Sequence, residues 1–162
     1  GLPDETLPDM QQSLVQVLAA GPENITVHTL ALKRGAALRD TADASTWQDN
    51  SVVCRMVDAA AREIRSAGLL PYYIYRQKNS PGNRENVGYA KPGAECIYNV
   101  DIIEERRTIL GMGPSATSKA VRMPDWRLDS CFFPKDIATY IRKITELAGK
   151  REQLIKTLFS AE

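Results

Sequence analysis

Cysteine and histidine are scarce in this sequence, and it has neither a long apolar run nor an excess of one charge. The three cysteines, Cys54, Cys96 and Cys131, lie far apart and form neither a Cys-x3-Cys-x2-Cys nor a Cys-x2-Cys pattern, so they predict no iron–sulfur or zinc site. They fit free thiols in a reducing compartment. No apolar run reaches the roughly 18 residues that indicate a membrane span. A formal net charge of +1 favours neither a nucleic-acid surface nor an acidic tail.

The composition that remains is typical of a soluble globular domain. The 162 residues can bury a core, and the hydrophobic share of 43% and charged share of 25% are ordinary. Helical and strand-like patterns alternate in the first half, which predicts an α/β fold with parallel strands joined by helical crossovers. The expected elements are a helix at 7–18, a strand at 24–32, a helix near 50–67 and a strand at 72–77.

The second half predicts a hairpin followed by a terminal helix. Strand-like residues 119–123 and 127–132 flank Pro124-Asp125-Trp126. Asp136 is expected to begin the last helix, whose apolar face continues past a break at Gly149. The polar stretches 33–48 and 76–95 are predicted to be loops.

The stretch Thr108–Ser118 is the most distinctive part of the chain. Thr108 to Leu110 predict a short buried strand, after which Gly111 and Gly113 let the backbone turn and approach a ligand closely. Ligands bind α/β sheets at such strand ends. A dinucleotide-binding fingerprint is the weaker interpretation, because Pro114 lies within the turn, and Pro124 and Trp126 follow too soon for a long helix. A tight turn without a ligand is the other alternative.

Four basic side chains lie among glycine and asparagine in and around the second loop: Arg76, Lys78, Arg84 and Lys91. They predict either an anion-binding loop, since arginine matches carboxylates bidentately, or a solvated loop without a ligand. His28, the only histidine, is a general acid or base or a strand histidine hydrogen-bonded within the sheet. The lack of a nearby serine or cysteine nucleophile favours the second interpretation.

Four stretches occur in a suggestive order: Gly1-Leu2-Pro3, Tyr89–Gly93, Glu95–Asn99 and Leu110–Ser118. Together they resemble the C-terminal part of the oxygen-independent coproporphyrinogen III oxidase family of radical SAM proteins, in particular its coproporphyrinogen dehydrogenase branch. The resemblance implies part of a βα barrel with a small hairpin and helix extension. Residues 1–75 would supply the last βα units of the barrel, and residues 76–162 the family-specific extension, packed as one unit.

The resemblance also implies ligands. S-adenosylmethionine would lie near Gly1, Gly111, Gly113, Ala116 and Thr117, and the basic residues would meet the propionates of the porphyrinogen substrate. With a [4Fe-4S] cluster, the parent protein would convert coproporphyrinogen III to protoporphyrinogen IX by oxidative decarboxylation in the cytoplasm. The cluster cysteines would lie in the N-terminal part of the parent chain, which is the expected partner. No catalytic or metal-binding residue is assigned here, and the chain alone is expected to be inactive and to associate through an exposed sheet edge.

Two other functions fit the same residues. Haem chaperones of the same family share the fold and several motifs but handle haem. Tyr98 stands where these relatives usually have a histidine, which favours the dehydrogenase branch. A non-enzymatic α/β interaction module is the third alternative. Product analysis with coproporphyrinogen distinguishes an oxidase from a chaperone.

Overall fold

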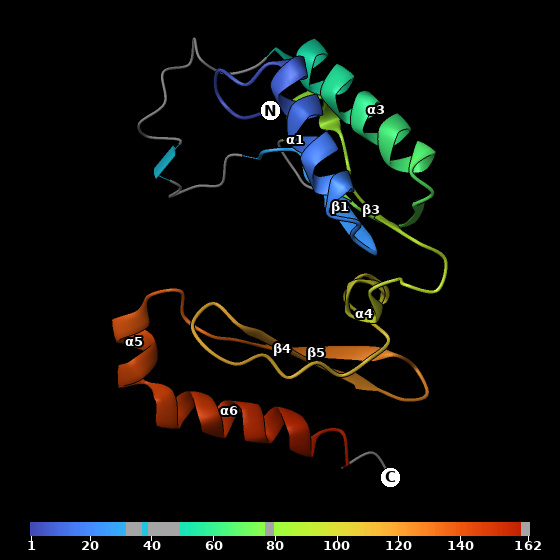
Figure 1. Ribbon diagram of the computed structural model, residues 1–162. Coiled ribbons are helices and arrows are strands. Elements are labelled where there is room, and N and C mark those ends of the chain that lie inside the picture. Colours follow the sequence, from blue (N-terminus) through green and yellow to red (C-terminus); the bar gives the residue numbers. More distant parts are fainter. Residues whose placement is uncertain (32–36, 39–48, 77–79, 160–162) are drawn as a thin grey trace. The chain divides into compact units, whose positions relative to one another are not determined.

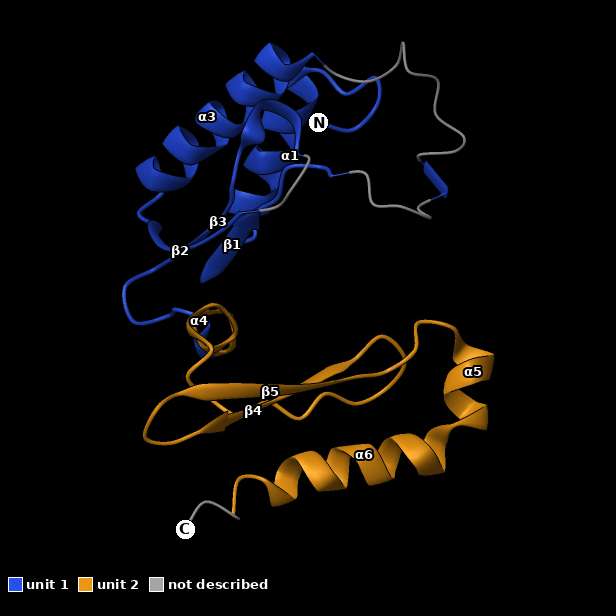
Figure 2. Ribbon diagram, turned by 180° about the vertical axis from the view of Figure 1, so that it is seen from behind, with its two compact units in different colours: residues 1–97 blue, residues 98–162 orange. Residues whose placement is uncertain are grey.

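The computed structural model describes residues 1–31, 37–38, 49–76 and 80–159 (Figure 1). These form two compact units, Gly1–Ile97 and Tyr98–Glu162 (Figure 2). The expected boundary at residue 75 between barrel elements and family-specific extension stays a prediction. The loop expected over 33–48 lies almost entirely outside the described residues. Of the helices described, none is long and apolar enough to cross a membrane.

Two helices of unit 1 form close to where the sequence predicts them. α1 (Leu7–Ala19) begins with a capping box, in which Thr6 and Asp9 each accept a hydrogen bond from the other's backbone. α3 (Asn50–Ser66) begins at Asp49, whose carboxylate accepts a backbone hydrogen bond from the first turn. Both helices therefore carry their start signals in the sequence itself.

The sheet of unit 1 has the strand order β1 (Asn24–Val27), β3 (Asn86–Ala90), β2 (Leu70–Tyr75), and both neighbouring pairs are antiparallel. β1 and β2 therefore run in the same direction, as expected for strands connected through α3. The α/β class is confirmed. The expectation of a parallel sheet is wrong for the described strands, because β3 lies between β1 and β2 and pairs with both.

β3 lies within the stretch that was expected to be a loop. Gly88 at its centre weakens the strand signal, yet the structure requires a glycine there. A Cβ on Gly88 would lie 2.0 Å from the ring of Tyr73, which crosses β3 and places its hydroxyl 3.4 Å from Thr26 Oγ1. β1 ends at Val27, so His28 follows the strand and is exposed, contrary to the strand-histidine interpretation.

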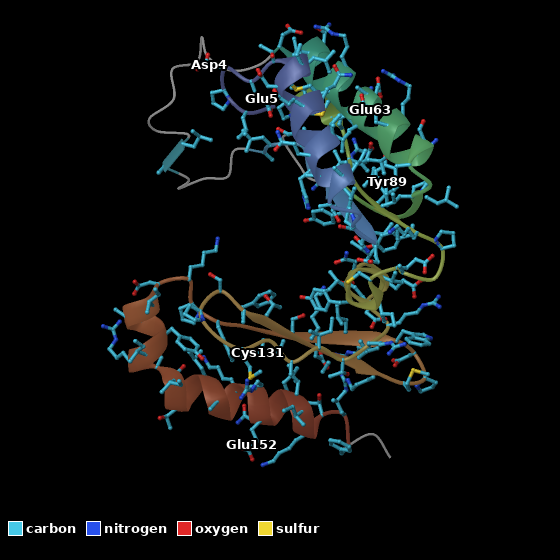
Figure 3. All side chains as sticks on the ribbon, viewed as in Figure 1. Asp4, Glu5, Glu63, Tyr89, Cys131 and Glu152 are labelled. Carbon is cyan, nitrogen blue, oxygen red and sulfur yellow. The ribbon has the colours of Figure 1, made fainter. Side chains whose placement is uncertain are left out.

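The core of unit 1 lies between the sheet and its two helices. Leu14 of α1, Ile64 of α3 and Tyr89 of β3 are buried in one cluster. Tyr89 is among the side chains labelled in Figure 3. Burial raises the pKa of the Tyr89 phenol above its ordinary value. At the margin, Gln11 donates a hydrogen bond of 2.9 Å to Glu63 and links the two helices. Unit 1 therefore has a hydrophobic core of its own.

Unit 2 is built on an antiparallel hairpin. β4 (Thr117–Arg122) and β5 (Arg127–Phe132) pair along their full lengths, which confirms the hairpin prediction. The strand expected at 108–110 is reduced to one bridge between Ile109 and Lys119. Before the hairpin lies α4 (Ile97–Glu104), a helix that was not among the elements expected from the sequence.

The terminal helix is divided, but not where expected. α5 (Ile137–Arg142) is capped by Asp136, as predicted. α6 (Ile144–Lys156) follows after Lys143, and Gly149 lies within its unbroken length. The predicted break at Gly149 is therefore wrong, since the helix already changes direction at Lys143. On α6, Leu147 and Leu154 are buried where the helix contacts the hairpin.

Candidate functional site

The glycine segment, residues 110–118, is a loop that runs into the first two residues of β4 and is closed by backbone pairing at its ends. Ile109 and Lys119 exchange two backbone hydrogen bonds of 2.8 Å. The Gly111 amide donates to Oγ of the buried Ser118 at 3.1 Å. A Cβ on Gly111 would lie 2.5 Å from the carbonyl oxygen of Thr117. Gly111 is therefore required by the close approach of the chain to itself.

Gly113 lies at the open apex of the glycine segment. Its φ is +97°, and among the described residues no atom beyond its two chain neighbours lies within 4 Å of the position that a Cβ would occupy. Backbone hydrogen bonds anchor the rest of the loop. The Ser115 amide donates to the Pro134 carbonyl at 2.8 Å, and the Phe133 amide donates to that of Ala116 at 2.9 Å. Apart from the neighbouring Met112 and Pro114, the space at the Cβ position of Gly113 is thus open to a ligand.

Arg151 connects α6 to the glycine segment, and sequence reasoning missed it. Its Nη1 donates to the Gly111 carbonyl at 3.4 Å, and its guanidinium carbon lies 6.0 Å from the centre of the Phe133 ring. A signal was available in the sequence. Arg151 shares one helical face with Leu147 and Leu154, so it is a charged residue on an otherwise apolar stripe.

Gly1 is the one predicted S-adenosylmethionine neighbour outside this segment. It belongs to unit 1, where a Cβ on it would lie 3.1 Å from Val53 Cγ2 of α3. The other four predicted residues lie together in the glycine segment of unit 2. That Gly1 adjoins this segment stays a prediction.

The predicted substrate-binding side chain of Arg84 binds α3. Its Nε donates to Cys54 Sγ at 3.3 Å, and its Nη2 donates to the Asp58 carboxylate at 2.9 Å. The hydrogen bond with Cys54 and the charge of Asp58 raise the pKa of Arg84. These contacts hold the short 3-10 helix η2 (Pro81–Asn83) against α3.

Of the other three basic side chains, Lys91 contacts its own chain, Arg76 is exposed, and Lys78 is not described. Lys91 Nζ donates to the Gly21 carbonyl at 3.2 Å. Arg76 is exposed just beyond β2, and Lys78 lies outside the described residues. Arg84 and Lys91 therefore bind their own chain, and a carboxylate-binding role for the four residues stays a prediction.

The cysteines are free thiols placed on different elements. Cys54 lies on α3, Cys96 directly before α4, and Cys131 on β5. Within the described part of the chain, no three His, Cys, Asp or Glu side chains are grouped so that they could hold a metal ion. The described cysteines thus offer no ligand set for an iron–sulfur cluster.

The chain is similar to the oxygen-independent coproporphyrinogen-III oxidase-like protein HemZ of Bacillus subtilis (strain 168). The two are 35% identical over 159 residues, which are 98% of this chain. The chain spans 32% of the length of that relative. The match confirms the resemblance to the oxygen-independent coproporphyrinogen III oxidase family that the four sequence stretches indicate. No protein-family model matches the chain, and no solved structure does.

Proposed function

We propose that this chain is the C-terminal part of a radical SAM oxidoreductase that decarboxylates coproporphyrinogen III oxidatively in haem biosynthesis. The observation that carries the proposal is the similarity to an oxidase-like relative along 98% of the chain. When bound in the parent protein, S-adenosylmethionine and a [4Fe-4S] cluster would supply the radical. The described cysteines do not fit a cluster, so its ligands would belong to the remainder of the parent chain.

In this proposal the glycine segment forms part of the S-adenosylmethionine site. The fit rests on Gly113, whose bare backbone faces open space. The backbone bonds of Ser115 and Ala116 hold the loop in place, so a ligand would meet a preformed surface and lose little affinity to loop ordering. Arg151 supports the loop from α6 through the Gly111 carbonyl.

Unit 1 would supply the last βα elements of a partial barrel. Support comes from β1 and β2, which run in the same direction and are connected through α3. β3 is an addition that lies between them in the sheet. The remaining barrel strands would belong to the rest of the parent chain.

The binding test is a valine substitution at Gly113 in the intact parent protein. Gly113→Val places a branched side chain where the ligand would pass. We expect S-adenosylmethionine affinity, measured by calorimetry, to fall about tenfold or more, a loss of about 1.4 kcal/mol.

Gly68→Val is the matched control, because Gly68 also has a positive φ, +87°, and open space around its Cβ position. Both substitutions carry similar backbone strain, about 1–3 kcal/mol. Only Gly113 lies in the proposed site, so Gly68→Val should retain affinity. Equal affinities in the two variants would remove the glycine segment from the site.

A further inference from the structure

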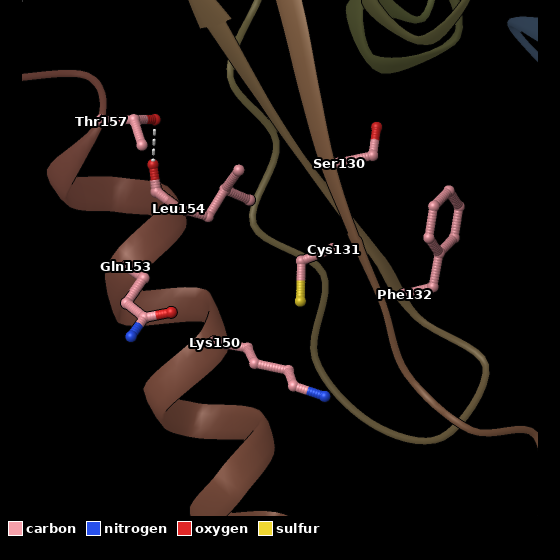
Figure 4. A pocket seen from close by; sticks show the side chains of 7 residues that line it. All are labelled: Ser130, Cys131, Phe132, Lys150, Gln153, Leu154 and Thr157. Carbon is pink, nitrogen blue, oxygen red and sulfur yellow. Dashed lines mark hydrogen bonds between the residues drawn. The ribbon is translucent and has the colours of Figure 1, made fainter.

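A pocket of about 430 Å³ lies between β5 and α6 (Figure 4). This volume is within the roughly 300–1,000 Å³ of small-molecule sites. No residue of the glycine segment lines it. The lining mixes an apolar wall with polar groups from both elements, including Ser130, Cys131, Phe132, Lys150 and Gln153.

Cys131 and Lys150 bring a nucleophile and a cation to the same pocket. The thiol points from β5 towards α6, and the Lys150 side chain extends towards β5 from α6 (Figure 4). Glu146 pairs with Lys150 at 2.7 Å, but Glu146 does not line the pocket. The hydrogen bond and charge of Glu146 raise the pKa of Lys150, so its ammonium stays protonated. The ammonium is therefore the charge that a ligand in the pocket meets.

Cys54 shows that a neighbouring cation alone does not make such a site. Arg84 donates a hydrogen bond to its sulfur. A Cβ on Gly82, however, would lie only 2.6 Å from that sulfur, so η2 covers the thiol. At Cys131 the cation is combined with open space through which a reagent can reach the sulfur.

We propose that this pocket binds an anionic low-molecular-weight disulfide, such as glutathione disulfide, and that Cys131 is modified there. A carboxylate of the ligand pairs with Lys150, which lines the pocket. The residues that line the pocket are not used in the S-adenosylmethionine proposal, so the two proposals are independent.

The reaction is a thiol–disulfide exchange. Cys131 gives its proton to solvent, and the thiolate attacks one sulfur of the ligand. As the new S–S bond forms, the ligand's own S–S bond breaks, and its second sulfur leaves as a thiolate that takes up a proton. Cys131 is oxidised and the leaving sulfur is reduced, so no further oxidant is needed. Lys150 contributes by pairing with a carboxylate of the ligand, which brings the disulfide to the thiol.

The test compares an anionic with a neutral disulfide on the intact chain. Glutathione disulfide and hydroxyethyl disulfide are each supplied, and modification of the Cys131 peptide is followed by mass spectrometry. Each rate is divided by the rate of the same reagent with a free small thiol. We expect Cys131 to prefer the anionic reagent about fivefold, the size of one close charge contact in water.

Two lysine variants identify the group responsible. Lys150→Gln should abolish the preference. Lys156→Gln is the matched control, because Lys156 also forms an i,i+4 ion pair of 2.7 Å on α6, with Glu152, but does not line the pocket. It should keep the preference, and Glu146→Gln should increase it by removing the competing carboxylate.

Three outcomes would overturn the proposal. They are equal normalised rates for the two reagents in the unaltered chain, an unchanged preference in Lys150→Gln, and an equal loss in both lysine variants. An equal loss in both lysine variants would mean that the charge of α6 in general, rather than a contact inside the pocket, determines the preference for the anionic reagent. Both lysines are exposed, 58% and 70%, so neither substitution disturbs the core.

Discussion

Gly88 lets the ring of Tyr73 cross the middle strand of the three-stranded sheet. Because a Cβ at this position would lie 2.0 Å from the ring, Gly88→Ala must displace Tyr73 and break its contact with Thr26. Overpacking of this kind costs about 1–3 kcal/mol. We therefore expect Gly88→Ala to lower the free energy of unfolding by that amount in urea titrations.

A double-mutant cycle isolates this clash. Tyr73→Ala removes the ring, so adding Gly88→Ala to it should cost much less than adding it to the unaltered chain. The remaining effect would combine a contact of 3.0 Å with the Tyr72 ring, which opposes alanine, and the reduced backbone freedom of the unfolded chain, which favours alanine. Additive effects of the two substitutions would show that the ring does not set the glycine requirement.

At the same scale, the sequence predicts the glycine segment but not the different roles of its glycines. Gly111 and Gly113 look equivalent in a Gly-x-Gly pattern. The first is required by the Thr117 carbonyl of the chain itself, and the second faces open space. Those environments come from contacts with β4 and from the chain after β5, which local pattern does not encode. Arg151 does interrupt an apolar stripe in the sequence, but that signal does not identify its partner, which lies 40 residues away.

Among the elements, α3 and α5 depend on acidic N-caps whose effect varies with pH. Hydrogen bonds with Ser51 lower the pKa of Asp49, and those with Thr139 lower that of Asp136. A depressed folded-state pKa gives stability that is fully present above the unfolded value and is lost as pH falls through the folded one. We expect the urea midpoint to fall once the pH drops below the ordinary aspartate value of 3.8.

Asp49→Asn tests this prediction, because asparagine also caps helices but does not titrate. Between about pH 5 and about pH 2, where depressed carboxylates lose their contribution, the midpoint should fall less in this variant. Asp125→Asn alters an exposed aspartate in the hairpin turn and should follow the unaltered chain. An identical fall in all three proteins would show that the Asp49 cap does not contribute.

Elements with local signals were predictable, and elements set by tertiary contacts were not. α1, α3 and the hairpin follow from caps, apolar stripes and a turn. β3 was missed because its central glycine is explained only by a ring on another strand. The parallel-sheet expectation was wrong for the same reason, since the missed strand changes the pairing of both neighbours.

At the scale of the whole molecule, unit 1 leaves one apolar edge of its sheet exposed. Unit 1 buries its core under α1 and α3, but β2 is an edge strand of its sheet, on which Leu70 and Ile74 are 55% and 60% exposed. An apolar edge of this kind is a template for pairing with another strand. In the proposed parent protein, additional barrel strands would cover it. The self-association expected of the isolated chain stays a prediction.

The 162-residue chain alone should neither bind an iron–sulfur cluster nor decarboxylate coproporphyrinogen. A [4Fe-4S] cluster is held by cysteine thiolates that converge on one site. Cys54, Cys96 and Cys131 are free thiols on separate elements, and no metal-binding group of side chains is found among the described residues. Anaerobic reconstitution with iron and sulfide should therefore leave the chain colourless, whereas the intact parent protein should take up the cluster. Binding of about four irons per chain, with cleavage of S-adenosylmethionine, would show instead that these residues suffice for the cluster.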